Sequence, residues 1–303
     1  MAAAQDALVP IIAEEAGGPA VPAVAAIAEA ARQRHGEGIP AVLFYGSVLR
    51  DQDIEGRIVD LYLLAESYDS LHRGAFTRAM NAALPPNVYY LETDFEGRRV
   101  RAKYALMTLA QFEKAVSPAT FHSYFWARFA QPATVVWHKD ASSRERLLRA
   151  LAGAVGTLIQ SAWPLFETAP ESRAFWERAF SETYRSELRA ERKGRAAQIY
   201  TANAVRYDRL LQAIPTASRG PQGRGVRRRA ALAWWGRRVA GKLLSVLRLI
   251  KAAFTFQDGA DYLAWKIKRH SGVELELTPW QRRHPILAAP VLFWSLYFRG
   301  AFR

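Results

Sequence analysis

The chain has 303 residues, half of them hydrophobic, and a net charge of +14 at pH 7. This length and composition are typical of a globular protein with a substantial core, and they exclude a disordered chain. The sequence has no cysteine, which excludes disulfides and zinc sites with cysteine ligands. Its six histidines lack the pair spacing of a helical metal site, so we do not expect a catalytic metal held by histidine.

The first part of the chain is expected to mix helices and strands. Ala, Val and Ile recur with a helical period over 21–35, and Gly and Pro then end the helix. The apolar runs AVLFYG (41–46) and IVDLYLLA (58–65) predict two buried strands, and a helix over 67–83 should follow them and end at a Pro-Pro pair. Residues 88–108 predict a β-hairpin with DFEGR as its turn.

Beyond residue 108 the pattern becomes mostly helical. Helices are predicted over 109–117, 119–130, 142–165, 171–190 and 195–214, with one strand over 133–138. The segment 215–229 is rich in Gly, Pro and Arg, which is the composition of a linker. We therefore expect an α+β protein with three parts: an α/β domain over 1–140, a helical domain over 141–214 and a basic tail over 215–303.

The positive charge is concentrated in that tail. From Arg219 to the C-terminus, 17 Lys and Arg residues stand against four Asp and Glu residues, so this segment carries +13 of the total charge. Within it, residues 231–256 have a helical period that separates an apolar face from a basic face. A basic amphipathic helix with Trp at its start is typical of a helix lying on an anionic membrane, although a core-packing helix with a solvated basic face is the alternative.

The residues of this helix that we expect to contact the membrane are Trp234, Trp235, Arg237, Arg238, Lys242, Arg248 and Lys251. The N-terminal sequence has no basic segment of a secretory presequence, and it contains acids that a mitochondrial presequence has few of. No apolar run reaches the roughly 20 residues that span a bilayer. We therefore expect a peripheral protein on the cytoplasmic face of a membrane.

The stretch FYGSVLRDQDIEGRIVDLYLL carries the first chemical motif, a Gly-Ser turn followed by a strand with one acid, Asp60. Polymerase-like nucleotidyltransferases follow such a turn with Asp-x-Asp, but the second position here is Tyr62. Gly46 would let the backbone approach a phosphate, and Ser47 would begin a helix whose N–H groups point at it. Asp60 would bind a Mg²⁺ held by the same phosphates. By itself the motif is weak, because Gly-Ser turns and single strand acids are common.

Four segments taken together are more specific. They read FYGSVLR…VDLYLL, NVYYLETDFEGRRVRAKYALMT, YFWARFAQPATVVWHKDASSRERLLRAL and TYRSELRAERKGRA. In this order they resemble the mitochondrial-type phosphatidate cytidylyltransferases, also called the translocator assembly and maintenance proteins, over about residues 41–214. The resemblance implies a nucleotidyltransferase-like mixed sheet and a Mg²⁺-dependent enzyme that makes CDP-diacylglycerol from CTP and phosphatidic acid.

The resemblance also implies roles for individual residues. The matching positions are Gly46 and Ser47 in the phosphate turn, Asp60 on the strand, Lys103 and Tyr104 in the hairpin, Arg128, Gln131 and Pro132 in the GRLQKP-like segment, and Glu187 and Arg189 in the helical segment. Asp60 and Glu187 would bind Mg²⁺, and Lys103 would neutralise charge developing on pyrophosphate. The residues expected to bind the nucleotide are Gly46, Ser47, Arg50, Tyr104 and Arg189. The sequence departs from the family pattern where Val48 follows the Gly-Ser pair, and where YRSE replaces YSGD.

Each of these residues has an ordinary alternative. Lys103 alternates with Arg99 and Arg101, as on a solvated strand face. Glu187 could belong to an exposed helix lined by opposite charges, and Arg50 is either a phosphate contact or a helix-surface charge. Two alternative functions also stay open: a nucleotidyltransferase acting on RNA or another phosphorylated acceptor, and a membrane scaffold with the nucleotidyltransferase fold but without catalytic activity. With phosphatidic acid as the acceptor, no nucleic acid partner is expected.

Overall fold

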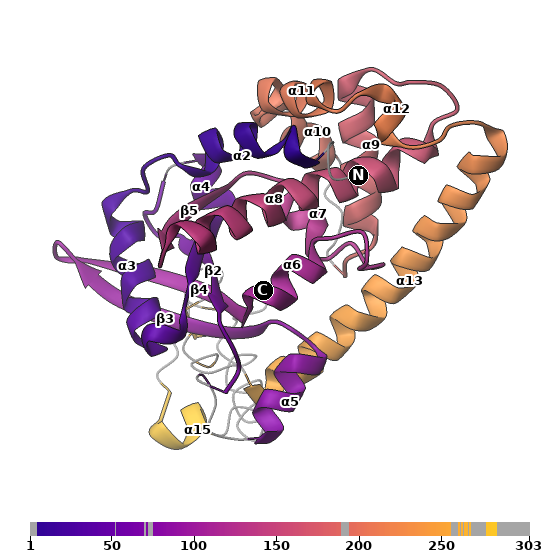
Figure 1. Cartoon of the computed structure of the whole chain (residues 1–303). Helices are drawn as coiled ribbons and strands as arrows, with labels where there is room; N and C mark the ends of the chain where they lie inside the picture. Colours follow the sequence, from indigo (N-terminus) through magenta and orange to yellow (C-terminus); the bar gives the residue numbers. More distant parts are fainter. Residues whose placement is uncertain are drawn as a thin grey trace.

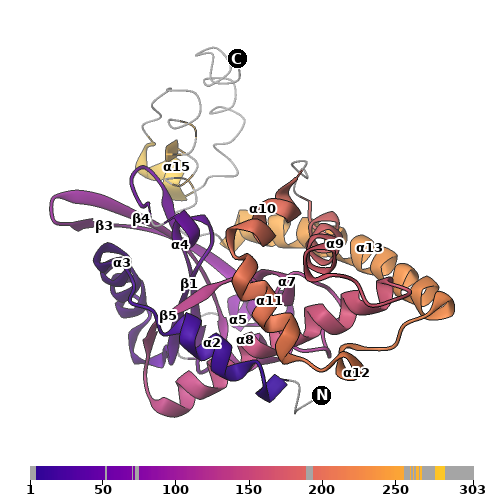
Figure 2. The same ribbon diagram turned by 90° about the horizontal axis from the view of Figure 1, so that it is seen from above.

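The protein is an α+β structure in which a five-stranded mixed sheet has helices on both faces (Figure 1). The computed structural model describes residues 5–51, 53–69, 71, 75–188, 194–255, 260, 262, 264–265, 267 and 277–283. Figure 2 shows the sheet on one side, the helices of residues 172–219 on the other, and the long helix of residues 224–255 along the edge of these helices.

The sheet has the strand order β3-β4-β2-β1-β5. The strands are β1 (Ala41–Tyr45), β2 (Ile58–Ala65), β3 (Asn87–Phe95), β4 (Arg98–Thr108) and β5 (Ala133–His138). β2 pairs with β4 in parallel, and all other neighbours are antiparallel. The two buried strands, the hairpin and the strand at 133–138 are therefore confirmed.

Alternation along the strands separates two faces of the sheet. Phe44, Leu61 and Tyr104 point to one face, which packs under α3 (Pro22–Gln33) in one hydrophobic cluster. Leu43 and Tyr62 point to the other face and belong to a second, larger cluster. Both faces are covered, so the apolar strands β1 and β2 are buried almost throughout.

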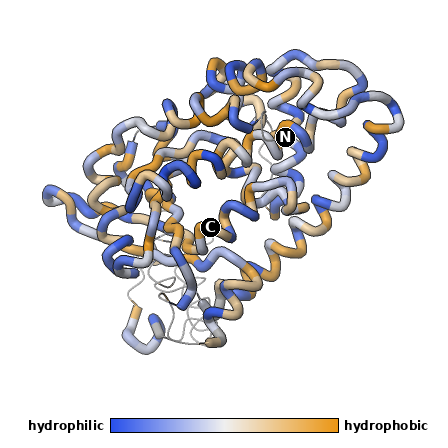
Figure 3. The backbone as a smooth tube through the Cα atoms, in the orientation of Figure 1, coloured by the Kyte–Doolittle hydropathy of each residue, from blue (hydrophilic) through white to orange (hydrophobic). Residues whose placement is uncertain are grey.

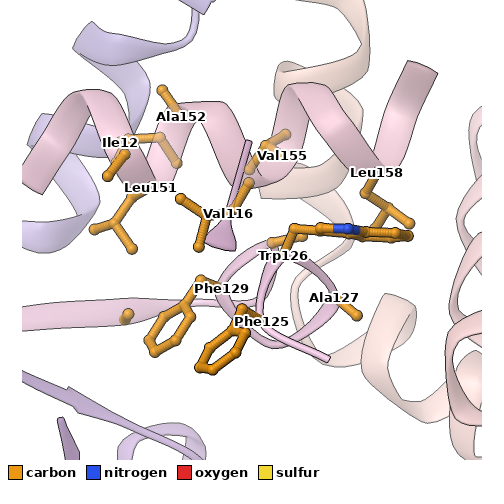
Figure 4. Packing of buried hydrophobic residues seen from close by; sticks show 14 of the residues in the cluster. Ile12, Val116, Phe125, Trp126, Ala127, Phe129, Leu151, Ala152, Val155 and Leu158 are labelled. Atoms are coloured by element: carbon orange, nitrogen blue, oxygen red, sulfur yellow. The ribbon is translucent and has the colours of Figure 1, made fainter. Parts of the chain in front are cut away.

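The larger cluster is built mainly from helices. Its helices are α2 (Val9–Ala16), α6 (Leu109–Ala115), α7 (Trp126–Phe129), α8 (Ala141–Ala162), η2 (Trp163–Leu165), α9 (Ser172–Arg185), α10 (Arg195–Ala202) and α11 (Ala204–Ala213). Figure 4 shows α8 lying over Trp126 and Phe129, with Val155 and Leu158 pointing toward them. Residues of the expected α/β and helical domains thus share one continuous core.

Shorter elements connect these layers. They are η1 (Gly36–Gly38), α4 (Ser47–Asp51), α5 (Ala75–Ala83), α12 (Thr216–Arg219) and α15 (Pro279–Arg283). The helix predicted over 119–130 is reduced to α7, because Ser117 and Thr120 donate their hydroxyls to the carbonyl of Lys114 and hold this segment in turns. The helix predicted over 195–214 is broken at Asn203, whose φ of −144° is not helical.

The helix α13 (Arg224–Thr255) is the longest element and replaces much of the expected linker. Its Trp234 is buried in the larger core cluster, where the indole N–H donates to the carbonyl of Ser161 over 2.9 Å. Gly241 passes so close to the carbonyl of Ser186 that the contact leaves no room for a Cβ. In Figure 3, α13 carries hydrophobic residues (orange) along its length. Among the helices of the described residues, none is long and apolar enough to cross a bilayer.

Candidate functional site

A cavity of about 640 Å³ lies between the sheet and the helices of the larger core cluster. Most of the residues that the sequence singled out line it. These are Gly46, Ser47, Arg50, Asp60, Lys103 and the segment residues Arg128, Gln131 and Pro132. The cavity therefore gathers residues that are as far apart in the chain as Glu15 and Tyr207.

The floor of the cavity is a row of residues across the sheet. Asp60 of β2 is in register with Lys103 of β4 on one side and with Tyr45 of β1 on the other. Tyr62 lies in the next row on the same face, because it follows Asp60 by two strand positions. The acid and the lysine thus lie side by side, with the tyrosine deeper in the cavity.

Gly46 is required by the geometry of the turn that follows β1. Its φ of +94° is one that side-chain-bearing residues rarely adopt. A Cβ at this position would lie 2.8 Å from Oδ2 of Asp60, so the turn can pass over the carboxylate only without a side chain. The helix α4 begins at the next residue, Ser47. Its Arg50 lines the cavity and forms an ion pair with Asp51 over 3.0 Å.

Aromatic residues and arginines form the opposite wall. The guanidinium of Arg128 lies 4.5 Å from the ring centroid of Tyr124 and 5.8 Å from that of Tyr45. Tyr62 is fully buried, and its hydroxyl has no hydrogen-bond partner within the described residues. Burial raises the pKa of the Tyr62 phenol well above its usual value, so the group is a neutral hydrogen-bond donor at pH 7. Arg195 of α10 adds a second positive charge to the wall.

Two residues assigned by the resemblance do not reach the cavity. Tyr104 points to the other face of the sheet, where its hydroxyl lies 2.9 Å from Nε2 of His35 and its ring stacks on Tyr89. The expectation that Tyr104 binds the nucleotide is therefore corrected: strand alternation places it opposite to Lys103. Arg189 lies outside the described residues.

Glu187 is close to the wall but not part of it. It follows the end of α9 at Arg185 instead of lying in a helix that reaches residue 190. It is not among the residues that line the cavity, yet its charge acts on Arg128 and Tyr124. Its position favours an electrostatic effect on Arg128 over direct binding of a metal at Asp60.

The inner face of α13 corrects the expected membrane contacts. Trp234 is buried, and Arg238 forms an ion pair with Glu182 over 3.2 Å. Lys251 is buried and donates from Nζ to Oδ1 of Asn81 and to the carbonyls of Leu84 and Pro86, within 2.9 Å in each case. Burial lowers the pKa of Lys251 to about 8. These cations bind the body of the protein instead of facing outward.

Arg237 and Arg248 also point toward the body. Nε of Arg237 donates to the carbonyl of Phe121 over 3.0 Å, and Nε of Arg248 donates to the carbonyl of Pro85 over the same distance. The Arg248 guanidinium lies 4.1 Å from the ring centroid of Tyr124, which lines the cavity. The expectation for Arg237, Arg238, Arg248 and Lys251 was wrong because the period of a helix groups residues by face without saying which face points outward.

The outward face of α13 is apolar. Six residues at helical spacing, each between 42% and 68% exposed, form what we call the outer stripe: Leu232, Trp235, Val239, Leu243, Val246 and Ile250. Exposed cations flank it at Arg228, Arg229 and Lys242, and none of these three forms an ion pair within the described residues. Two of the seven expected membrane contacts are therefore exposed on this face: Trp235 belongs to the stripe, and Lys242 flanks it.

A metal ion at this site would have few protein ligands. The described residues contain no group of three or more His, Cys, Asp or Glu side chains that could hold one. Mg²⁺ is commonly bound by one or two carboxylates together with substrate phosphates and water. Oδ2 of Asp60 lies next to the turn at Gly46. A phosphate bound at this turn would therefore be close to the carboxylate, and Asp60 could be the single protein ligand of a Mg²⁺ ion beside it.

Sequence reasoning missed two features of this region. Arg195, the first residue of α10, lines the cavity. The sequence around it, which includes Gly194, does not distinguish Arg195 from the many other arginines of the chain. Glu182 is buried and lies within 3.5 Å of Arg178 and Arg185 as well as near Arg238. The spacing of Glu182 from Arg178 and Arg185 was visible in the sequence as i, i+4 and i, i+3 pairs, but its contact with α13 was not.

Comparison with known proteins adds no further evidence on these assignments. No protein-family model matches the chain, and no curated protein is significantly similar to it. The assignment of the cavity therefore depends on its own geometry and on the four resembling segments.

Proposed function

We propose that the chain is a Mg²⁺-dependent cytidylyltransferase that converts CTP and phosphatidic acid to CDP-diacylglycerol and pyrophosphate at a membrane surface. The observation that carries this proposal is the cavity floor, where Gly46, Asp60 and Lys103 meet although β1, β2 and β4 are separate in the chain. A turn without a side chain, a carboxylate and a cation are the groups that nucleotidyl transfer needs.

The residues of the floor have complementary parts in this reaction. The turn at Gly46 and Ser47 would receive the phosphates of CTP, and Asp60 would bind Mg²⁺ beside them. When bound, Mg²⁺ would neutralise phosphate charge and orient the α-phosphate for attack. Lys103 and Arg50 would stabilise the negative charge that develops on the leaving pyrophosphate.

The acceptor explains why one carboxylate is sufficient. An attacking hydroxyl must lose its proton, which requires a base or a second metal. A phosphate monoester is already ionised at neutral pH, since its second pKa is about 6, so its oxygen attacks without a base. The presence of Tyr62 in place of a second acid on β2 supports a phosphate acceptor over a hydroxyl acceptor.

The outer stripe supports a lipid substrate. An exposed apolar helix face flanked by the unpaired cations Arg228, Arg229 and Lys242 complements the acyl boundary and anionic headgroups of a bilayer. RNA binding would need an extended row of outward cations, whereas Arg238, Arg248 and Lys251 of this helix are turned inward and its outward face is mainly apolar. A scaffold without catalytic activity would not need the cavity floor. Cytosine as the base follows from the resemblance alone.

The test is pyrophosphate release by the purified chain with Mg²⁺, CTP and vesicles that contain phosphatidic acid. Vesicles with phosphatidylserine at equal charge are the matched control, because their phosphate is a diester. ATP, GTP and UTP replace CTP in parallel reactions. We expect release only with CTP and phosphatidic acid together. Absence of release with every nucleotide, from folded protein bound to the vesicles, would refute the proposal.

A further inference from the structure

The inner end of the cavity contains polar groups that the proposed reaction has not yet used. Tyr62 lines the cavity two positions along β2 from Asp60 and on the same face of the sheet. Its ring packs against Phe129, with ring centroids 5.0 Å apart, while its hydroxyl is buried and makes no hydrogen bond within the described residues. Buried hydroxyls are nearly always hydrogen-bonded, so this one lacks a partner that a ligand would supply.

Arg128 is separated from Tyr62 by the ring of Tyr45, whose centroid lies 5.8 Å from the Arg128 guanidinium and 5.5 Å from the Tyr62 ring centroid. It comes from α7 on the opposite wall and lines the same cavity. Within the part of the chain that the structure describes, no ion pair joins Arg128 to a carboxylate, and its guanidinium rests against the rings of Tyr45 and Tyr124. Arg128 also donates a hydrogen bond to the hydroxyl of Tyr124. The fork of N–H groups on a guanidinium can bind a planar or tetrahedral anion in addition.

A second arginine increases the positive potential at this point. Arg248 of α13 lies against Tyr124 and Phe125, with its guanidinium 4.1 Å and 5.5 Å from their ring centroids. Its Nη1 atom is buried and has no hydrogen-bond partner within the described residues. Two guanidinium groups on one tyrosine ring repel each other, and a bound anion would relieve this repulsion.

We propose that Tyr62 and Arg128 form an anion subsite for the phosphate monoester of the acceptor, positioned by Tyr124 and Arg248. The subsite deepens the proposed function and rests on it for the identity of that phosphate. Two strand positions separate the Cα atoms of Tyr62 and Asp60 by about 7 Å, and both side chains lie on the same face of the sheet. The acceptor phosphate is therefore next to the α-phosphate of a nucleotide held at Asp60.

This placement gives a balanced transfer step. An ionised oxygen of the acceptor phosphate attacks the α-phosphorus of CTP and forms the new P–O bond. The bond from the α-phosphorus to the oxygen that bridges to the β-phosphate breaks, and pyrophosphate leaves with that electron pair. No proton is removed from the acceptor, so the Tyr62 hydroxyl acts only as a hydrogen-bond donor.

Tyr62→Phe tests the subsite, because it removes one hydroxyl and keeps the ring. We expect the KM for phosphatidic acid to rise about 10-fold or more, since a buried hydrogen bond to a charged group is lost. The KM for CTP should not change. Tyr89→Phe, which removes a hydroxyl on the other face of the sheet, is the matched control and should change neither value. An unchanged KM for phosphatidic acid, or an equal rise for CTP, would overturn the proposal.

Arg248 requires a readout that separates positioning from stability. Arg248→Met should raise the KM for phosphatidic acid and leave the KM for CTP unchanged, and Arg248→Lys should restore part of the loss because it keeps the charge. Equal effects of the two variants on both KM values would contradict a positioning role.

A binding measurement separates the subsite from the proposed function. The full chain is titrated with inorganic phosphate without nucleotide or Mg²⁺, and binding is measured by calorimetry. We expect wild-type protein to bind phosphate and Tyr62→Phe to bind it about 10-fold more weakly, even if the protein shows no turnover with CTP. Competition by CTP without competition by a soluble phosphatidic acid would assign the subsite to the nucleotide and overturn the acceptor assignment. Equal phosphate binding by both proteins would overturn the subsite itself.

Discussion

The cavity floor and the helix α13 place their charges in opposite ways. On the floor, Asp60 and Lys103 line a cavity and face a space that a ligand can enter. On α13, Arg238 and Lys251 face the body and are bound by Glu182, Asn81 and two carbonyls, while the outer stripe presents apolar side chains. The charge of a segment therefore does not measure the charge that it presents to a partner.

This difference separates a chemical role from a structural one. Cations bound by carbonyls hold α13 against the loop before β3, where Pro86 lines the cavity. In the proposed function, the outer stripe contacts the membrane and the cavity holds the substrates. Changes on the floor should affect turnover without affecting the fold, changes on the inner face of α13 should affect the fold, and changes on the outer stripe should affect membrane binding.

The largest expected effect is on the floor. Asp60→Asn should lower kcat by about a thousandfold, because the loss of a metal-binding carboxylate removes roughly 4 kcal/mol of transition-state stabilisation. The far-ultraviolet circular dichroism and the melting temperature should stay near those of the wild type. Asp94→Asn, on an exposed part of β3, is the matched control and should keep full activity. Near-normal turnover of Asp60→Asn would remove the metal assignment.

The outer stripe should give the next largest effect. Val239→Glu combined with Leu243→Glu should weaken binding to anionic vesicles by about 100-fold, because each change loses apolar burial and adds repulsion from headgroups. CTP binding should not change, which isothermal titration can verify. Val205→Glu is the control, since Val205 is exposed on α11 and away from the stripe. Equal vesicle binding by the double variant and the control would mean that another surface meets the membrane.

Changes at the inner face of α13 should lower the stability of the folded protein. Glu182→Gln should lower the free energy of unfolding by about 2 kcal/mol, less than for a fully buried pair because its three arginine partners are 31% to 50% exposed. Urea denaturation measures this value. Glu177→Gln breaks a surface pair with Arg173 and should leave the free energy of unfolding nearly unchanged. Similar small losses in both variants would show that the ion pair between Glu182 and Arg238 contributes little to holding α13.

The smallest effect concerns pH. Burial lowers the pKa of His122 to about 4, with a further contribution from the positive charge of Arg248. Below pH 6.5 the unfolded chain binds a proton that the folded chain takes up only near pH 4, so stability is complete above pH 6.5 and falls as the pH drops between these values. Because the ring is partly exposed, the loss should be about 1 to 2 kcal/mol.

His122→Asn should flatten this part of the stability curve, as measured by denaturation at several pH values. A slope that persists in His122→Asn would assign the pH dependence to other groups. The measured slope also tests the contact between α13 and the cavity wall. Arg248 of α13 acts on His122 electrostatically and packs against Tyr124, which lines the cavity.

Strand period was enough to predict much of the floor. Alternation placed Asp60 and Tyr62 on one face, and the same rule, applied to Lys103 and Tyr104, already implies that only one of this pair can reach the site. The register between β2 and β4 could not be read from the sequence, because these parallel strands are joined by a long connection that contains α5 and β3 and not by a short turn.

Helix period was less informative for α13. The sequence separated its apolar and basic residues correctly, but Glu182, Asn81 and the carbonyls that receive the cations come from other elements. The need for glycine at position 241 could not be predicted either, because the close approach of Gly241 to Ser186 depends on how α13 crosses the end of α9. Long-range contacts decide which face of a helix points outward.

The most direct test of the central claim is mass spectrometry of the lipid product. Wild-type protein and Asp60→Asn are incubated with Mg²⁺, isotopically labelled CTP and vesicles that contain phosphatidic acid, and the lipids are extracted. If the cavity floor and the outer stripe act together in a membrane-surface enzyme, the wild type forms labelled CDP-diacylglycerol and Asp60→Asn forms almost none. Labelled CMP in solution without a labelled lipid, or no labelled product at all, would contradict it.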